Sequence, residues 1–492
     1  MLGITRNLIM PTSNFRATNN HPLLRSLSRS IVPIGCLLIF AFRITQIWLN
    51  PTDDFDTSSF ILVVQGGFYP TAFFFDIAHP GLLSAVLKIC QLIKIATHLP
   101  AIYIWSTLIS LGLALACITL FYLMKALKCS NQVSYFTCFV YMISPAVSDV
   151  AARSEENILF HSPMMLTLML CLFYIKRQSL TLLMLVAVSA LILAAQHIQP
   201  FLIVSAGLML FLASELWRSK GQVGTEVRAA LKLFLTLTAI GFVFYVAMHY
   251  AFYNPMVVRA YSNNFFSILH NDSFIRYVKA YLLFAQGYLF TGELPINYAT
   301  NVGVDPRGPI YLLGIGVTVC AFILSNRRRF TDCFILPALG FAFLYEPSAS
   351  ERWDTLVIAM VISLMSRLDD VTQTGCDSNK FYRPRMIWIP LTIAILLNGY
   401  ALRGQLTQIV NTNNAQSSMG YQLGPSKVVY SDLDSARQFV SRGPRDIELQ
   451  NIDVAQPKLG DAIFLKNGPE FAKDKFKFRC TPTTISDLCV IR

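Results

Sequence analysis

The chain has 492 residues, of which 54% are hydrophobic and only 14% are charged. An ordinary soluble domain has about 25% charged residues, so this composition excludes that class of protein. The net charge of +12 is not accompanied by a basic patch with interleaved aromatic residues, and nucleic acid is therefore not an expected partner.

Residues 1–30 form a basic N-terminal segment that contains no acid. The apolar segment that follows, 31–49, is too long for a cleavable signal peptide and lacks a small-residue cleavage site, so we expect a signal anchor with a cytoplasmic flank. Arg43 lies inside this span near its outer end. A charge within a membrane span is a functional candidate by default, and one of the acids that follow the span is its expected partner.

Apolar runs of about 20 residues, the length at which a helix crosses a bilayer, predict an all-α polytopic transmembrane domain over residues 31–402. About eleven candidate spans lie near 31–49, 101–124, 132–148, 159–175, 180–196, 200–217, 231–252, 309–325, 331–346, 354–367 and 386–402. Alternate connections are basic, at 125–128, 176–177, 218–232, 327–329 and 367–385. Because basic loops stay in the cytoplasm, we expect the N-terminus inside and the C-terminus outside.

Residues 403–492 are polar, with Gly, Pro, Asn and Asp throughout, and are long enough for a small domain. Segments 427–430 and 462–465 predict short strands, so we expect a small extracytoplasmic α+β domain. Cys480 and Cys489 stand apart in this tail and could pair if it faces an oxidising compartment.

The predicted first outer loop, residues 50–80, holds a dense group of acids just after the first span. Asp53 and Asp54 are catalytic candidates, and Asp56, Asp76 and His79 are substrate-binding candidates. One carboxylate near an acceptor hydroxyl can act as a general base, which contributes about 10²–10⁴-fold, and crowding among carboxylates raises the pKa of one of them. The alternative is a solvated acidic turn that caps a helix.

The pair Asp54-x-Asp56 also has the form of a metal-binding motif, so a divalent metal is a minority expectation, although no Cys/His metal spacing occurs in the chain. The stretch after Pro80 is amphipathic at helical spacing, which predicts a helix lying in the membrane interface.

Two short outer connections carry further polar candidates. In 149–158, Glu155 is a second catalytic candidate and Arg153 and Glu156 are substrate contacts, unless the loop is solvated and its ion pairs are internal. In the turn 196–200, His197 and Gln199 either hold a phosphate or sugar or are satisfied polar groups of a helix connection.

Two arginines in outer loops are candidates for binding a phosphate. Arg352 lies near the outer start of a late span, and Arg259 lies in the long loop 253–308. A guanidinium binds phosphate oxygens in pairs, whereas the alternative is that an arginine at a span end simply snorkels to the interface.

The arrangement resembles the GT-C membrane glycosyltransferases, above all protein O-mannosyltransferases and the bacterial transferases that put aminoarabinose on lipid A. Asp53-Asp54 stands at the family's acidic pair, and His79-Pro80-Gly81-Leu82 stands at its Pro-Pro-Leu element. Arg153 and Glu155 occupy the second acidic site, and Arg352 occupies the place of a late arginine. The segment 196–200 falls at the family's Thr-Lys-Gly/Gln-Pro turn, although this chain has no lysine there.

The resemblance implies a GT-C-like bundle with interfacial helices and a soluble outer domain. It implies inverting transfer of a sugar from a polyprenyl-phosphate donor to an extracytoplasmic glycan, lipid or protein, with a first-loop Asp as general base. The expected location is the bacterial inner membrane, and membrane lipid is an expected partner. A transporter or flippase of a lipid-linked saccharide is the alternative, and a structural membrane subunit is a third reading.

Overall fold

The structure is a computed structural model, and it describes the helices, the strands and the turns between some of them. The described residues are 35, 55–66, 82–143, 147, 150–151, 154–219, 224–252, 330–344, 354–374, 428–432, 436, 439–440, 448–452, 458, 462–465, 480–482 and 488–491.

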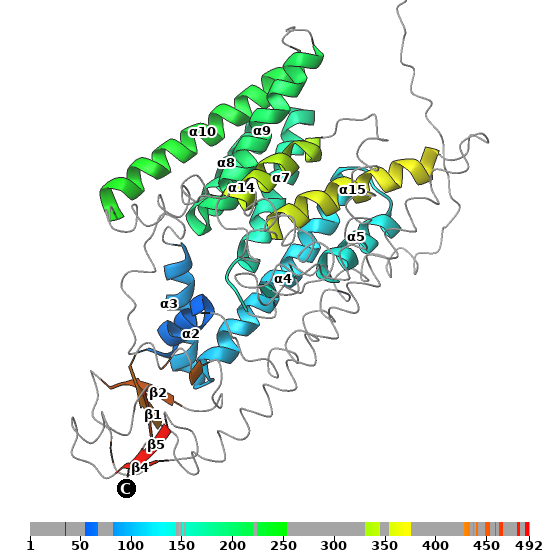
Figure 1. The fold of residues 1–492 in the computed structure, drawn as a ribbon. Coiled ribbons are helices and arrows are strands. Elements are labelled where there is room, and N and C mark those ends of the chain that lie inside the picture. The colour runs from blue at the N-terminus through cyan, green and yellow to red at the C-terminus, as the bar shows by residue number, and fades with distance from the viewer. Residues whose placement is uncertain are drawn as a thin grey trace, which may run out of the picture.

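Most of the described chain is a helical bundle (Figure 1). Its elements are α2 (Phe55–Gln65), α3 (Leu82–Thr97), α4 (Ala101–Ala126), α5 (Asn131–Ile143), α7 (Ile158–Arg177), α8 (Leu180–Gln196), α9 (Ile198–Arg218), α10 (Thr225–Phe252), the 3-10 helix η2 (Phe330–Phe334), α14 (Ile335–Leu344) and α15 (Asp354–Thr374). Helices lie where spans were predicted to start near 101, 132, 159, 180, 200, 231, 331 and 354, so these segments are confirmed as helices. The predicted spans 309–325 and 386–402, and all of 31–49 except Gly35, lie outside the described residues.

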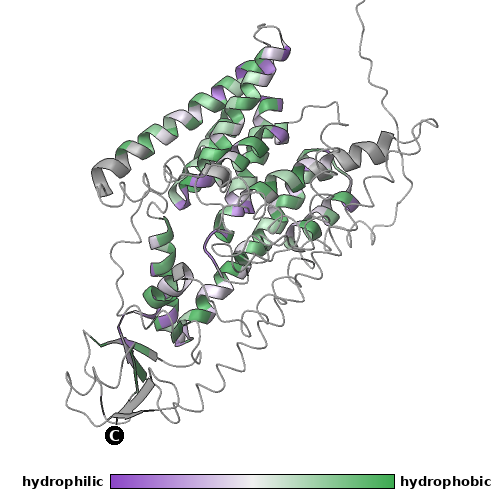
Figure 2. Cartoon of the chain, viewed as in Figure 1, coloured by the Kyte–Doolittle hydropathy of each residue, from purple (hydrophilic) through white to green (hydrophobic). Residues whose placement is uncertain are grey.

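Four of the described helices are long and apolar enough to cross a membrane: α4, residues 157–177, α9 and residues 225–244. Hydrophobic residues run along most of these helices (Figure 2). On α8 and α10 many of the large apolar side chains are exposed, among them Leu180, Met184, Val188, Leu235 and Phe242. Exposed apolar surface of this extent suits a lipid solvent, and the chain is a multi-pass membrane protein.

The helices approach one another closely where glycine leaves room. Gly112 of α4 faces α7, and a Cβ there would lie 2.9 Å from Leu159 Cδ2. Gly207 of α9 faces η2, where the ring of Phe334 occupies the space that a Cβ would need. Small residues at helix contacts are typical of membrane bundles, because close approach increases the van der Waals contact between helices.

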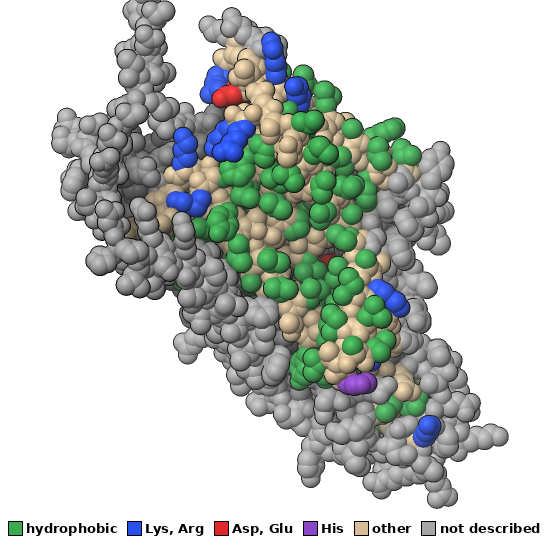
Figure 3. Space-filling view, turned by 180° about the vertical axis from the view of Figure 1, so that it is seen from behind, with side chains coloured by type: hydrophobic (Ala, Val, Ile, Leu, Met, Phe, Trp, Pro, Cys, Tyr) green, Lys and Arg blue, Asp and Glu red, His purple; other side chains and the backbone are tan. Residues whose placement is uncertain are grey.

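Basic residues mark one end of the bundle, which we call the basic end. Lys125, Lys176, Arg177 and Arg218 lie in the last turns of α4, α7 and α9. Most of the Lys and Arg side chains visible in Figure 3 gather toward the top of the surface, above an apolar band, and a few lie at the lower right.

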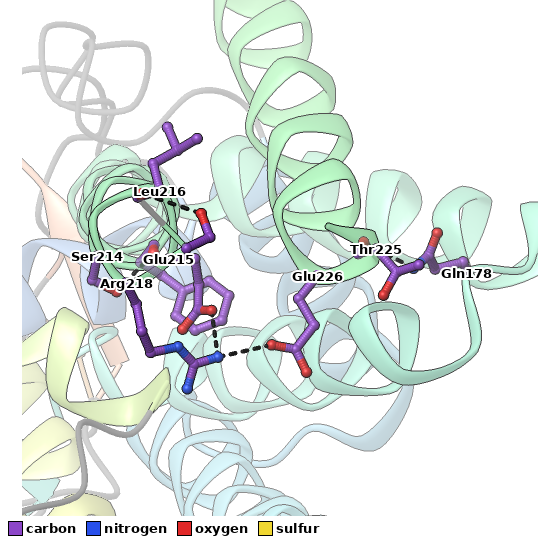
Figure 4. A network of polar contacts seen from close by, with 9 residues as sticks. Gln178, Ser214, Glu215, Leu216, Arg218, Thr225 and Glu226 are labelled. Carbon is purple, nitrogen blue, oxygen red and sulfur yellow. Dashed lines mark hydrogen bonds and ion pairs between the residues drawn. The ribbon is translucent and has the colours of Figure 1, made fainter. Parts of the chain in front are cut away.

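A polar network ties two helices together at the basic end (Figure 4). Arg218 Nη2 donates to Glu215 at 2.7 Å and to Glu226 at 3.2 Å, so it links α9 to the start of α10. Gln178 Nε2 donates to the carbonyl of Thr225 at 3.0 Å. These pairs are largely exposed, and each is therefore worth about 1 kcal/mol or less.

Two helices precede the bundle core. α3 confirms that the stretch after Pro80 is a helix with one buried face: it buries Leu83, Leu87 and Cys90 and exposes Ile89 and Leu92. Its place in the membrane interface stays a prediction. Burial raises the pKa of the Cys90 thiol, so this cysteine behaves as a small apolar residue.

Within the predicted first loop, residues 55–65 are not loop but the helix α2. Thr57 to Leu62 are all buried against the neighbouring helices, and this segment shows no amphipathic period because it is enclosed on every side.

The C-terminal strands form one five-stranded sheet of order β2-β1-β3-β5-β4. β1 (Val428–Ser431) pairs in parallel with β2 (Glu448–Asn451) and β3 (Ala462–Phe464). β5 (Leu488–Ile491) runs antiparallel to β3 and to β4 (Cys480–Pro482). The predicted strands 427–430 and 462–465 are thus confirmed as β1 and β3.

The sheet lies beside α2 and α3 in Figure 1, and α2 contacts β2. Its register sets Cys480 opposite Ile491 and Cys489 opposite Pro482, so the two cysteines occupy diagonal positions. Their side chains are not described, so the pairing of these two cysteines stays a prediction.

Candidate functional site

The site is built at the end of the bundle opposite the basic end, where α7, α9 and α15 begin and α5 finishes. We call it the acidic end, after Glu155, Glu156 and Asp354. Consecutive helices run antiparallel through short connections, so their termini meet there.

The turn before α7 is held through Ser154. Ser154 has a left-handed backbone (φ 57°), which is costly for a residue with a Cβ and persists only where the surroundings enforce it. Its carbonyl accepts from Trp105 Nε1 at 2.9 Å and from Thr57 Oγ1 at 3.3 Å. Its hydroxyl lies 3.2 Å from Ser106 Oγ. Residues of α2 and α4 therefore fix the turn that carries the acids.

Glu155 and Glu156 follow this residue directly, and their side chains are only 3% and 8% exposed. Their burial contradicts the solvated loop of that alternative, whereas its internal ion pairs stay a prediction. A carboxylate withdrawn from water requires a polar or charged environment, because desolvation disfavours its ionised form. Asn157, next in the chain, is 3% exposed, and its Oδ1 accepts no hydrogen bond from the residues that the structure describes.

The turn between α8 and α9 lies next to this acidic turn. His197 Nδ1 accepts from the backbone N–H of Gln199 at 3.1 Å and caps α9. The His197 ring packs on Phe160 with centroids 5.1 Å apart, and Gln199 is fully buried. The reading of a helix connection with satisfied polar groups holds for His197 Nδ1. A contact of these residues with phosphate or sugar stays a prediction.

A chain of three buried polar side chains joins three helices at the same end. The Tyr141 hydroxyl of α5 lies 2.6 Å from His161 Nδ1 of α7, and His161 Nε2 lies 2.7 Å from Asp354 Oδ2 of α15. All three residues are 0% exposed. Sequence patterns did not single out these three residues, although one signal was present: His161 is an ionisable residue within an apolar span.

Most of the other predicted site residues cannot be placed. Asp53, Asp54, Asp76, His79, Arg153, Arg259 and Arg352, like Arg43, lie outside the described residues. Asp56 is the second residue of α2, and its side chain is not described.

The acidic pair nevertheless immediately precedes α2. The bond from Thr57 to Ser154 shows that the start of α2 meets the turn that carries Glu155. The two predicted acidic segments, Asp53-Asp54 and Glu155-Glu156, are therefore close in sequence to the two residues that this hydrogen bond joins.

The structure leaves the metal expectation open. Within the described part of the chain, no group of three His, Cys, Asp or Glu residues could hold a metal ion. Asp54 and the side chain of Asp56 lie outside the described part of the structure, so a divalent metal at this motif stays a prediction.

Comparison with known proteins identifies the fold. No protein-family model matches the sequence, and no curated protein sequence matches it. Among solved structures, the chain is similar to apo ArnT from Cupriavidus metallidurans with a TM-score of 0.51 and 11% identity, over 95% of this chain and 98% of that chain. ArnT from the same organism bound to undecaprenyl phosphate gives a TM-score of 0.49 at 11% identity, with the same coverage. ArnT is a lipid A aminoarabinose transferase of the GT-C type, and this chain has its fold.

Proposed function

From the ArnT-like GT-C fold as the premise, we propose that this chain is a membrane glycosyltransferase that uses a polyprenyl-phosphate-linked sugar. The observation that carries the proposal is the acidic end of that fold. There, the start of α2, directly after Asp53-Asp54, is hydrogen-bonded to the turn that carries Glu155 and Glu156. Acids brought together at one end of a membrane bundle suit group transfer at the membrane surface.

The proposed reaction is an inverting displacement. The acceptor hydroxyl attacks the anomeric carbon of the donor sugar, its proton passes to Asp53 or Asp54, and the bond to phosphate breaks so that polyprenyl phosphate leaves. Asp54 is three residues before Thr57, and three residues span at most about 11 Å. The base would therefore lie within reach of the buried turn at Glu155, and Arg352 would hold the phosphate that leaves.

The proposed orientation places the acidic end and the C-terminal sheet outside the cytoplasm, with residues 403–492 as an outer domain, in a bacterial inner membrane. The gathering of Lys and Arg at the basic end supports it (Figure 3). A reporter that is active only in the cytoplasm, fused after Arg492, should be silent, and an active fusion would reverse the orientation.

The test is sugar transfer by purified protein from a polyprenyl-phosphate-linked sugar, measured as release of the lipid phosphate and gain of mass by an acceptor. We expect Asp53→Asn and Asp54→Asn to differ, with one losing about 10²-fold or more in rate because only one carboxylate can be the base. Glu226→Gln, which alters an exposed acid at the basic end, is the matched control and should retain wild-type activity.

Wild-type rates in both Asp variants would refute the catalytic assignment of this loop. Transport of the intact lipid-linked sugar across a liposome membrane, without release of lipid phosphate, would instead establish the flippase alternative.

A further inference from the structure

The buried, hydrogen-bonded residues Tyr141, His161 and Asp354 join α5, α7 and α15 at the acidic end. We propose that these three residues are positioning residues: they hold the start of α15, the helix that follows Arg352 in the chain, against the start of α7, the helix that follows Glu155 and Glu156. This inference rests on the proposed function, because it takes Arg352 as the residue that binds the lipid phosphate.

The chain positions of the residues support this role. His161 lies in the first turns of α7, six residues after Glu155, and Asp354 is the first residue of α15, two residues after Arg352. The hydrogen bond between His161 and Asp354 fixes the start of α15 relative to the start of α7. Because a helix rises 1.5 Å per residue, a slip of α15 by one residue would move its first residue by about that distance.

The direction of each hydrogen bond among these three side chains follows from their chemistry. A carboxylate only accepts, so His161 Nε2 carries a proton and donates it to Asp354. In the neutral imidazole, Nδ1 then accepts from the Tyr141 hydroxyl.

The cost of burying these groups argues for a specific role. All three side chains are withdrawn from solvent, and a buried acid–histidine pair adds little net stability compared with apolar side chains of the same volume. Asp354 lies at the N-terminus of α15, where the helix dipole favours its negative charge. Its Oδ1 receives no hydrogen bond within the part of the chain that the structure describes. A buried pair that adds little net stability is best suited to fixing one arrangement of the helices.

A second buried pair provides the matched control. Thr167 Oγ1 and Ser189 Oγ lie 2.7 Å apart and join α7 to α8, both helices of the same bundle, without involving α15. Both residues are buried. Removing this pair perturbs the stability of α7 but leaves the α7–α15 link intact.

The experiment measures equilibrium binding of undecaprenyl phosphate to the full chain in lipid nanodiscs, together with thermal stability. The key variant is His161→Phe with Asp354→Leu, because apolar side chains refill the site and preserve folding where either single change would strand a buried polar group. We expect this variant to fold and to bind undecaprenyl phosphate about tenfold more weakly, and Tyr141→Phe, which keeps the His161–Asp354 bond, to show a smaller loss. The control Thr167→Val with Ser189→Ala should bind as the wild type does.

Wild-type affinity in the folded double variant would overturn the inference, and so would an equal loss of affinity in the control. Absence of undecaprenyl phosphate binding by the wild type would also overturn it. The sugar-transfer assay tests the proposed function independently of this positioning role. A wild type that binds the lipid phosphate without transferring sugar would refute the transferase, whereas a weakened double variant would still support the positioning role.

Discussion

The carbonyl of Ser154 holds the acidic turn in place, because it accepts hydrogen bonds from two side chains. Mutations of these two donors should therefore have non-additive effects on the free energy of unfolding. The bond from Trp105 Nε1 is 2.9 Å, at the preferred length, whereas the bond from Thr57 Oγ1 is 3.3 Å and therefore weaker. Trp105→Phe keeps an aromatic ring beside Phe60 but removes the stronger donor. We expect it to lower the free energy of unfolding by about 1 kcal/mol, and Thr57→Val to lower it by less.

The double variant Trp105→Phe/Thr57→Val should lose more than the sum of the two single variants. With both donors gone, the buried carbonyl keeps neither bond, and an unsatisfied buried acceptor costs about 1–3 kcal/mol. The coupling between the two sites should therefore be about 1 kcal/mol or more, measured by thermal unfolding of all four proteins in one detergent. If the losses of the two single variants add up to that of the double variant, the two donors do not share the Ser154 carbonyl as proposed. The sugar-transfer rate should also fall further in the double variant than in either single variant, because Glu155 follows Ser154 directly.

Two further predictions concern other parts of the molecule. Gly207→Ala should destabilise the protein by about 1–3 kcal/mol, because Phe334 occupies the space of the new methyl group, whereas Gly340→Ala, where the space is open, should be nearly neutral in the same unfolding assay. Arg352→Lys should raise the apparent KM for the polyprenyl-phosphate sugar without changing thermal stability, because an ammonium cannot bind phosphate oxygens in pairs, and an unchanged KM would leave this arginine as a snorkelling anchor.

Sequence patterns located the described apolar helices, because hydropathy over about 20 residues is a local property. The same approach failed for α2, where burial on all sides removes the amphipathic period that marks a helix. The strands β1 and β3 were found because short β-branched and aromatic runs stand out in a polar tail.

The candidate site was predictable only where its polar groups lie close together in the chain. Glu155 and Glu156 were found because acids at the start of a span stand out. Their burial was not foreseen, because it depends on α2 and α4, which meet the turn across long sequence separations. The link between His161 and Asp354 spans 193 residues, and no local pattern predicts such a pair.

The two kinds of helix contact in this bundle have different consequences for function. In lipid, helices gain no hydrophobic energy from one another, so close packing and polar bonds determine their arrangement. Gly112 and Gly207 provide close packing along the helices, whereas Ser154, His161 and Asp354 provide directional bonds at the acidic end. Packing defects relax over many side chains, but a lost directional bond frees one loop. Damage at the glycines should therefore appear in stability alone, whereas damage at the polar bonds should appear in the transfer rate as well as in stability, because a misplacement of about 1 Å can cost about 10²-fold in rate.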